Sequence, residues 1–282
     1  MKKVICIVGP TGSGKTRLSI ELAKYLNTEI INGDSVSLYE KLDIGAAKVT
    51  PEQMQGIPHH LINHVKLSDN YSVFNFQQDV RSIIDNIDLP LIVGGSGLYI
   101  QSALYDYRFE NQSDYIYPSL SEMIQVIQTK DPDAHIDLNN TRRIESAYRT
   151  IMSGQKRSAK TNKNVPLYDI FLIYLDMDRV ILKTRLINRL DQMIDKGFIE
   201  ETKALMMHDL NIIGYKEIQA YLRGLYTLKI AKEKIITATM RFAKRQKTWF
   251  LNQMQPHVYD ALDQNLFEDI VKDLKEFLGA KG

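Results

Sequence analysis

Two short motifs near the start of the chain carry side chains that can do chemistry. The first, "GPTGSGKT", matches the pattern G-x-x-x-x-G-K-[ST], and the second, "NGDS", spans residues 32–35. In such a loop the glycines let backbone N–H groups converge on phosphate oxygens, the lysine reaches the outer phosphates and the last hydroxyl ligates Mg²⁺. The motif predicts a phosphate cradle, which is a loop that binds phosphate groups, without specifying which compound carries them. We assign phosphate binding to Gly9, Pro10, Thr11, Gly12, Ser13, Gly14, Lys15 and Thr16.

The second motif places a carboxylate close to this cradle. Asp34 and Ser35 follow the apolar run "EII", which we interpret as a strand. In a parallel sheet, the carboxyl end of a strand beside the phosphate loop opens onto the same crevice. Helix capping is the alternative role, because Asp and Ser are favoured caps. An Asp ionised at neutral pH can also accept a proton during catalysis.

Two absences weigh against phosphoryl transfer. A phosphate-loop NTPase carries an aspartate at the end of a buried strand to help hold Mg²⁺. Here "LIVGGSG" offers Gly94, Gly95 and Ser96 at that point. A nucleotide kinase also tends to close an arginine-rich lid over its phosphates, yet residues 105–127 contain a single arginine, Arg108. A kinase or ATPase, although open as an alternative, is therefore disfavoured.

The elements that must position these side chains alternate between strands and helices. Apolar runs at residues 4–8, 89–97 and 170–175 predict buried strands, and Leu18, Leu22 and Leu26 recur at helical spacing. This order predicts an α/β fold: a P-loop-type core with a parallel sheet flanked by helices. We place the core at residues 1–104 and 141–282, with a small, mostly helical insertion at 105–140. Beyond Asp176 we expect only helices, near 178–195, 200–207, 215–223, 230–252 and 264–278.

Composition limits the class of protein and its surroundings. The chain has 282 residues, a net charge of +2 and 44% hydrophobic residues, which is ordinary for a globular protein. The single cysteine, Cys6, excludes a disulfide framework, and no apolar stretch approaches the roughly 18–20 residues of a membrane span. We expect a cytoplasmic protein with no membrane partner, and we expect it to be a monomer.

With these residues assembled, the chain resembles the tRNA dimethylallyltransferase family, also called tRNA isopentenyltransferases. "GDSVSLYEKLDIGAAK" corresponds to the family pattern D-S-x-x-x-Y-x-x-x-D-I-G-T-A-K. The resemblance runs from Val4 to about residue 252 and is specific because many motifs occur in the family's order. These are "GPTGSGKT", "IPHHLI", "GGSGLY", "DPDAHIDLNNTRRI", "RLDQMIDKGFIEE", "IGYKE" and "AKRQKTW".

The resemblance implies a reaction and a role for each motif. The cradle would hold the diphosphate of dimethylallyl diphosphate, and the acceptor would be N6 of the adenine at position 37, beside the tRNA anticodon. Asp34 would be the general base, Thr16 would ligate Mg²⁺, and Arg189 would stabilise the departing diphosphate. A solvated helix charge is the alternative for Arg189.

The expected contacts with tRNA depend on recognition of a single-stranded loop and on local positive charge. Residues 229–249 contain seven basic residues and one acid, with Phe242 and Trp249 interleaved. The loop 153–163 adds further cations: Lys156, Arg157, Lys160 and Lys163. The resemblance and this charge together assign tRNA contacts to Asp34, Ser35, Val36, Ser37, Ser96, Arg142, Arg143, Lys244 and Arg245, with the anticodon stem-loop as partner.

Several features depart from the family or leave alternatives open. Ala46 replaces a family threonine, Ser37 a frequent Gln, and Ser146 and Arg149 an arginine and a glutamate, all of which bear on RNA contacts. The insertion is also shorter than the family's. Prenylation of free adenine nucleotides and a non-catalytic RNA-binding module remain open. Adjacent His59 and His60 are interpreted as structural, because no Cys or carboxylate stands at ligand spacing.

Overall fold

The computed structural model describes residues 1–107, 117–158 and 165–279, apart from the side chain of Arg142. Within these ranges the strands form one parallel six-stranded sheet in the order β3-β2-β4-β1-β5-β6. The strands are β1 (Lys3–Val8), β2 (Ile30–Asn32), β3 (His59–His60), β4 (Leu91–Gly94), β5 (Asp169–Asp176) and β6 (His257–Asp260). The predicted α/β class is confirmed.

β1 lies at the centre because its sequence suits burial on both faces. Val4 to Val8 have no exposed surface, as expected for a continuous apolar run between layers of helices. β1 pairs with β4 on one side and β5 on the other, so that Val8 lies opposite Gly94 and Tyr174. The phosphate loop therefore leaves the sheet directly beside the Gly94-Gly95 turn.

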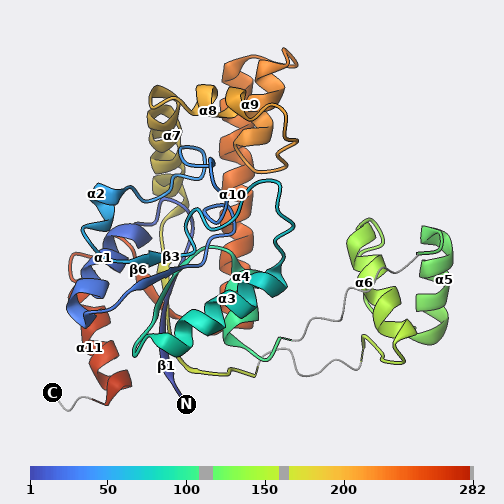
Figure 1. Ribbon diagram of the computed structural model, residues 1–282, viewed down its shortest axis with the longest axis horizontal. Helices are drawn as coiled ribbons and strands as arrows, with labels where there is room; N and C mark the ends of the chain where they lie inside the picture. Colours follow the sequence, from blue (N-terminus) through green and yellow to red (C-terminus); the bar gives the residue numbers. More distant parts are fainter. Residues whose placement is uncertain (108–116, 159–164, 280–282) are drawn as a thin grey trace. The chain divides into compact units, whose positions relative to one another are not determined.

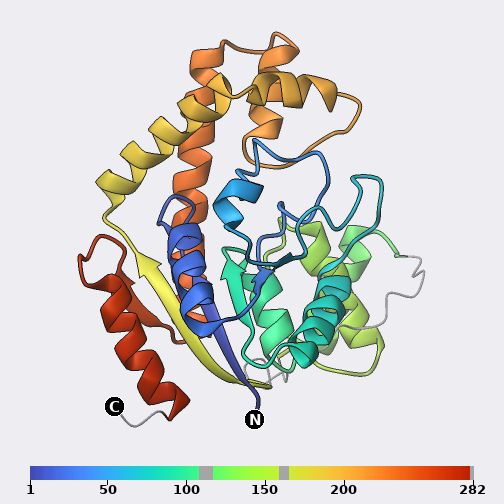
Figure 2. The same cartoon turned by 60° about the vertical axis from the view of Figure 1, so that its left-hand side comes forward.

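Helices cover the sheet and extend beyond it. In Figure 1 the long α10 runs from the sheet toward α7, α8 and α9, and Figure 2 shows the same helices from another side. The helices of this part are α1 (Lys15–Leu26), α2 (Pro51–Met54), α3 (Val73–Asn86), α4 (Gly97–Leu104), α7 (Arg179–Asp195), α8 (Phe198–Ala204), α9 (Tyr215–Leu222), α10 (Leu228–Gln253) and α11 (Leu266–Leu278).

The expectation that only helices follow Asp176 is wrong. His257–Asp260 forms β6, which pairs in parallel with β5, with Ile173 opposite His257 and Asp176 opposite Asp260. β6 lies at the sheet edge and is mostly exposed, so it lacks the apolar pattern that identifies a buried strand. β3 escaped notice for a related reason, since it is only two residues long.

The chain divides into two compact units, residues 1–104 with 166–282, and Tyr105–Val165. The second unit contains α5 (Leu120–Lys130) and α6 (Thr141–Met152), whose apolar faces pack together through Met123, Ile127, Ile144 and Ile151. The boundary expected at residue 140 is therefore wrong: α6 belongs with α5, because its strongly amphipathic face needs that partner. Arg108, Lys160 and Lys163 lie outside the described residues.

Among the described residues, no helix combines the length and apolar character needed to span a membrane.

Candidate active site

The phosphate loop has the backbone that its sequence requires. Gly9, Gly12 and Gly14 have φ values of 148°, 90° and 94°, in the region that other residues rarely adopt. A Cβ on Gly9 would also lie 2.8 Å from the carbonyl oxygen of Leu175 in β5. The Ser13 N–H donates to the Pro10 carbonyl at 3.2 Å, which closes the loop before α1 begins.

Lys15 is held inside this loop by carbonyl groups. Its Nζ donates to the Gly9 carbonyl at 2.8 Å and to the Pro10 carbonyl at 2.9 Å. Burial lowers the pKa of Lys15 from 10.5 to about 8, an effect that nearby Asp34 opposes and Arg189 reinforces. The surrounding groups thus offset only part of the cost of burying the ammonium charge, and an anion bound beside it would favour its charged form.

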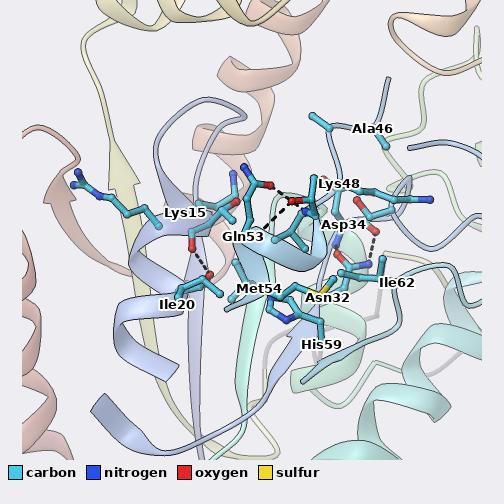
Figure 3. A pocket seen from close by; sticks show the side chains of 18 of the residues that line it. Lys15, Ile20, Asn32, Asp34, Ala46, Lys48, Gln53, Met54, His59 and Ile62 are labelled. Atoms are coloured by element: carbon cyan, nitrogen blue, oxygen red, sulfur yellow. Dashed lines mark hydrogen bonds between the residues drawn. The ribbon is translucent and has the colours of Figure 1, made fainter. Parts of the chain in front are cut away.

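A cavity of about 1160 Å³ opens in front of the loop. Figure 3 shows Lys15, Asn32, Asp34, Lys48 and His59 among the side chains that line it. Its charged lining comes from separate elements, because the carboxyl ends of parallel strands and the start of α1 face one crevice. Those charged residues are Lys15, Arg17, Glu21, Lys24, Asp34, Asp43, Lys48, Arg185, Arg189 and Lys196.

The position of Asp34 is set by Asn32, the last residue of β2. The Asn32 side chain donates to the carbonyls of Asp34 and Leu61, each at 2.9 Å, and its oxygen accepts from the Asp34 N–H at 3.0 Å. The Asp34 carboxylate in turn accepts from the Val36 N–H at 3.0 Å. These contacts fix the backbone and leave the second carboxylate oxygen available to the cavity.

The turn after β4 explains why no second acidic residue stands there. A Cβ on Gly94 would lie 2.1 Å from the backbone of Gly33, so this position has no room for a side chain. The Ser96 N–H donates to the Gly33 carbonyl at 3.2 Å, and the Ser96 hydroxyl contacts the N–H and hydroxyl of Ser35 at 3.0 and 3.1 Å. The two turns form one backbone platform beside Asp34.

Arg189 reaches the cavity from α7. Its Nη2 donates to the Ala47 carbonyl at 3.4 Å, and Ala47 itself adopts a φ of 48°. Burial lowers the pKa of Arg189, while Asp34 acts in the opposite direction. Arg185, one turn earlier on the same face of α7, also lines the cavity and donates to the Gly12 carbonyl at 3.3 Å.

The structure brings some of the predicted site residues together and separates others. Around the cavity lie Thr11, Gly12, Gly14, Lys15, Thr16, Asp34, Ser37 and Arg189. Gly9, Pro10 and Ser13 support the loop from within, and Val36 packs against the core. Ser35 and Ser96 bond to each other outside the lining. Arg142 and Arg143 belong to the second unit, where the Arg143 side chain is exposed.

The basic residues of α10 differ in their surroundings. Lys244 and Arg245 are exposed, and the Arg245 guanidinium lies 5.8 Å from the centre of the Phe242 ring. Lys247 instead pairs with Asp176 at 2.6 Å, and Lys232 pairs with Asp191. Gln246, between Arg245 and Lys247, is buried and donates to the Gly95 carbonyl at 2.8 Å, which connects α10 to the turn after β4.

His59 and His60 have partners within the protein. The His59 ring bonds to the Ile57 carbonyl at 2.8 Å, and His60 bonds to Glu29 at 2.6 Å. Burial lowers the pKa of His59, which favours its neutral form at one wall of the cavity. Within the ranges that the structure describes, no group of three His, Cys, Asp or Glu side chains is placed to hold a metal ion.

Sequence reasoning missed several residues that organise the site. Asn32, Lys48, Glu201 and Gln246 are the main ones, and each lies inside a quoted motif. The Lys48 Nζ donates to the Asp43 carboxylate at 2.9 Å and also to the side-chain oxygen of Asn63. The partners of Glu201 and Gln246 lie far away in sequence, so only the positions of these two residues within recurring motifs could have indicated them. Asn32 and Lys48 bond to Asp34 and Asp43 within their own motifs, where an Asn or Lys by itself does not specify such a bond.

Comparison with known proteins gives a consistent result. The model of the family described as IPP transferase matches residues 37–253. A tRNA dimethylallyltransferase of Acholeplasma laidlawii is 69% identical over 279 residues, covering 99% of this chain and 100% of the relative.

Solved structures show the same similarity in three dimensions. A tRNA delta(2)-isopentenylpyrophosphate transferase of Staphylococcus epidermidis has a TM-score of 0.75 at 33% identity, with 98% of this chain and 100% of that one covered. A eukaryotic dimethylallyltransferase captured acting on tRNA has a TM-score of 0.86 at 26% identity, with 100% and 81% covered. Because the family model and a near-full-length relative both match, this chain belongs to the IPP transferase family.

Proposed function

We propose that this enzyme transfers a dimethylallyl group from dimethylallyl diphosphate to N6 of adenine 37 in tRNA, releasing diphosphate. The observation that carries the proposal is that Lys15 and Thr16 of the phosphate loop, Asp34 and Arg189 all line the same cavity. Such a cavity offers a place for a diphosphate and a proton acceptor beside it. The family membership supports the same reaction.

The chemistry follows from the two substrates. The N6 lone pair attacks the allylic carbon, an N–C bond forms, and the C–O bond to diphosphate breaks. The amine becomes acidic only as the new bond forms, so the Asp34 carboxylate accepts its proton at that stage. Asp34 is suited to this role because Asn32 fixes its backbone while its side chain lines the cavity.

The leaving diphosphate gains negative charge as the C–O bond breaks. Lys15, the loop N–H groups and Arg189 are the groups that would stabilise it, and losing one such donor typically costs about 3–4 kcal/mol. The lowered pKa of Lys15 fits this role, because a buried ammonium gains most from an anion that replaces its carbonyl contacts.

The residues present fit a magnesium ion that arrives with the diphosphate. Thr16 is exposed at the cavity and offers one oxygen ligand. Since the described residues provide no cluster of three ligands, diphosphate and water oxygens would complete the shell, as is usual for Mg²⁺. When bound, the ion would neutralise charge on the diphosphate.

The acceptor side of the proposal rests on the anticodon stem-loop. Ser35, Val36, Ser37 and Ser96 lie at or near the turn beside Asp34, where an extruded adenine would have to enter. The exposed Lys244 and Arg245 would contact the RNA backbone, and Arg142 and Arg143 would contribute from the second unit. We propose a monomer that acts in the cytoplasm, where tRNA is available.

The test is incubation of the purified protein with Mg²⁺, dimethylallyl diphosphate and unmodified tRNA carrying adenine at position 37. Mass spectrometry of the nucleosides should show a five-carbon adduct on that adenine, whereas AMP in a parallel reaction should remain unmodified. An adduct on AMP alone would assign the enzyme to free nucleotides. If neither acceptor were modified and the protein consumed ATP in a separate incubation, the proposal would be refuted in favour of a P-loop kinase or ATPase.

A further inference from the structure

The Glu201 carboxylate, on α8, accepts four hydrogen bonds from two separate parts of the fold. Its Oε2 accepts from the backbone N–H groups of Asp43 at 3.1 Å and Ile44 at 2.7 Å. Its Oε1 accepts from the Gly45 N–H at 3.0 Å and from the Tyr215 hydroxyl at 2.7 Å. Consecutive N–H groups around one carboxylate form charge-assisted bonds, which are stronger than neutral ones.

Packing also confines this loop at Gly45. A Cβ on Gly45 would lie 2.2 Å from the ring of Phe198 and 2.5 Å from that of Tyr215, so only glycine fits. Those rings meet edge to face at 5.1 Å, and neither has any exposed surface. α8 and α9 thus grip the loop through both hydrogen bonds and close contact.

The other end of the same loop contacts Arg189. The Ala47 N–H donates to the Ile44 carbonyl at 2.9 Å, and the Ala47 carbonyl accepts from Arg189 Nη2 at 3.4 Å. Ala47 and Arg189 both line the cavity, whereas Glu201 and Tyr215 lie outside its lining. Displacing residues 43–45 would therefore move the Ala47 carbonyl and change where the guanidinium of Arg189 rests.

We infer that Glu201 and Tyr215 are positioning residues that hold Arg189 against the diphosphate through the loop 43–47. The inference rests on the proposed function only for the role of Arg189, and it assigns neither Glu201 nor Tyr215 a contact with substrate. It gives a role to an acidic and an aromatic side chain that lie outside the cavity lining, in the motifs "RLDQMIDKGFIEE" and "IGYKE".

A double-mutant cycle tests this inference with Glu201→Gln, Arg189→Ala and the two combined. The quantity measured is the affinity for inorganic diphosphate with Mg²⁺, by titration calorimetry. Glu201→Gln should weaken binding about five- to ten-fold when Arg189 is present and less than two-fold when Arg189 is already Ala, because coupled residues are not additive. Effects that simply multiply would overturn the inference.

Tyr215→Phe provides a second variant that keeps the packing. It removes only the hydroxyl, so the ring contact with Phe198 remains. We expect a two- to three-fold weaker affinity for diphosphate, again absent in the Arg189→Ala background, with little change in the thermal midpoint. An unchanged affinity in Tyr215→Phe would contradict the role of the pair, even if Glu201→Gln fails to fold.

Glu200→Gln is the matched control. Glu200 is the neighbour of Glu201 on α8 and is exposed, so this change should leave the diphosphate affinity unaltered in both backgrounds. The cycle uses diphosphate without an acceptor, which separates the two proposals. A coupled cycle without transfer to tRNA would refute the proposed function alone, whereas an uncoupled cycle in an active enzyme would refute the positioning role alone.

Discussion

At the scale of single residues, the cavity side chains are held by the backbone of their own loops. Asp34 is fixed through Asn32 and the Val36 N–H, and Lys15 through the Gly9 and Pro10 carbonyls. Such arrangements keep a reacting group in place before substrate arrives, which removes part of the cost of orienting it during the reaction. Two predictions concern these side chains.

Asp34→Asn should remove the proton acceptor and keep the fold. The Asn oxygen can still accept from the Val36 N–H, so the turn should survive the change. We expect the single-turnover rate of transfer to tRNA to fall at least about a hundred-fold, the lower range for general-base catalysis. Diphosphate affinity should change less than three-fold. A rate within a few-fold of the unmodified protein would disprove the assignment of Asp34.

The affinity for diphosphate should depend on pH through Lys15. Its pKa of about 8 in the free protein lies below the ordinary 10.5, because burial disfavours the charge. Bound diphosphate favours the ammonium and raises this pKa, so binding takes up a proton above about pH 8 and not well below it. Affinity should therefore fall as the pH rises through 8.

Calorimetry at pH 7 and pH 9, in buffers of different ionisation enthalpy, measures the proton uptake. Lys15→Arg is the control, since its guanidinium stays charged at both pH values while the titration of the diphosphate itself remains. Extra proton uptake at pH 9 should be present with Lys15 and absent with Arg. Identical uptake in the two proteins would contradict the lowered pKa.

At the scale of elements, close backbone approach at the ends of β2 and β4 determines where Asp34 and the other candidate site residues of these turns lie. Gly33 and Gly94 touch, and Gly33 N–H donates to the Val93 carbonyl at 2.7 Å. This contact excludes a side chain, and hence a carboxylate, from Gly94 at the end of β4, so the acid beside this turn is Asp34, which follows β2. The same contact brings Ser96 to Ser35.

Gly94→Ala should therefore be strongly destabilising, since the added Cβ would lie 2.1 Å from backbone that cannot move aside. We expect the free energy of unfolding, from urea titration, to fall by at least about 2 kcal/mol. Gly224→Ala is the comparison, because nothing lies within 4 Å there and only its φ of 75° is unfavourable. That change should cost about 1 kcal/mol. Equal losses would show that the Gly33 contact does not matter.

At the scale of the whole molecule, positive charge is concentrated in local regions, and the chain as a whole has almost no excess of it. The net charge is only +2, yet α10 carries exposed Lys244 and Arg245. Two other cations of this helix, Lys232 and Lys247, pair with Asp191 of α7 and Asp176 of β5. An RNA backbone would thus meet the cations of α10 that are exposed and carry no ion pair with a described residue, with Lys244 and Arg245 among them.

The double variant Lys244→Gln, Arg245→Gln should show a reduced salt dependence of tRNA binding. Each lost phosphate contact lowers the slope of log K against log salt by about 0.7–0.9, so we expect a decrease of about 1–2. Binding measured between low and physiological salt tests this. Lys272→Gln, an exposed lysine on α11, is the control and should leave the slope unchanged. An unaltered slope in the double variant would exclude these residues from the RNA contact.

The sequence by itself determined the class of fold, the phosphate loop and the family. These follow from local information: a buried apolar run, glycines at fixed spacing and motifs in a recurring order. Asp34 could be placed near the loop because parallel strands end at one edge. β6 and the end of the insertion were predicted wrongly, since an exposed edge strand and a helix pair depend on partners that local patterns do not specify.

Only the tertiary structure decided how the site is supported. Glu201 meets the amides of residues 43–45 across more than a hundred and fifty positions of sequence, and Gln246 meets Gly95 over a similar separation. The structure likewise pairs Lys232 and Lys247 of α10 with acids of other elements. Hydrogen bonds and close packing form between whichever groups the fold brings together, so no spacing within the chain reveals them.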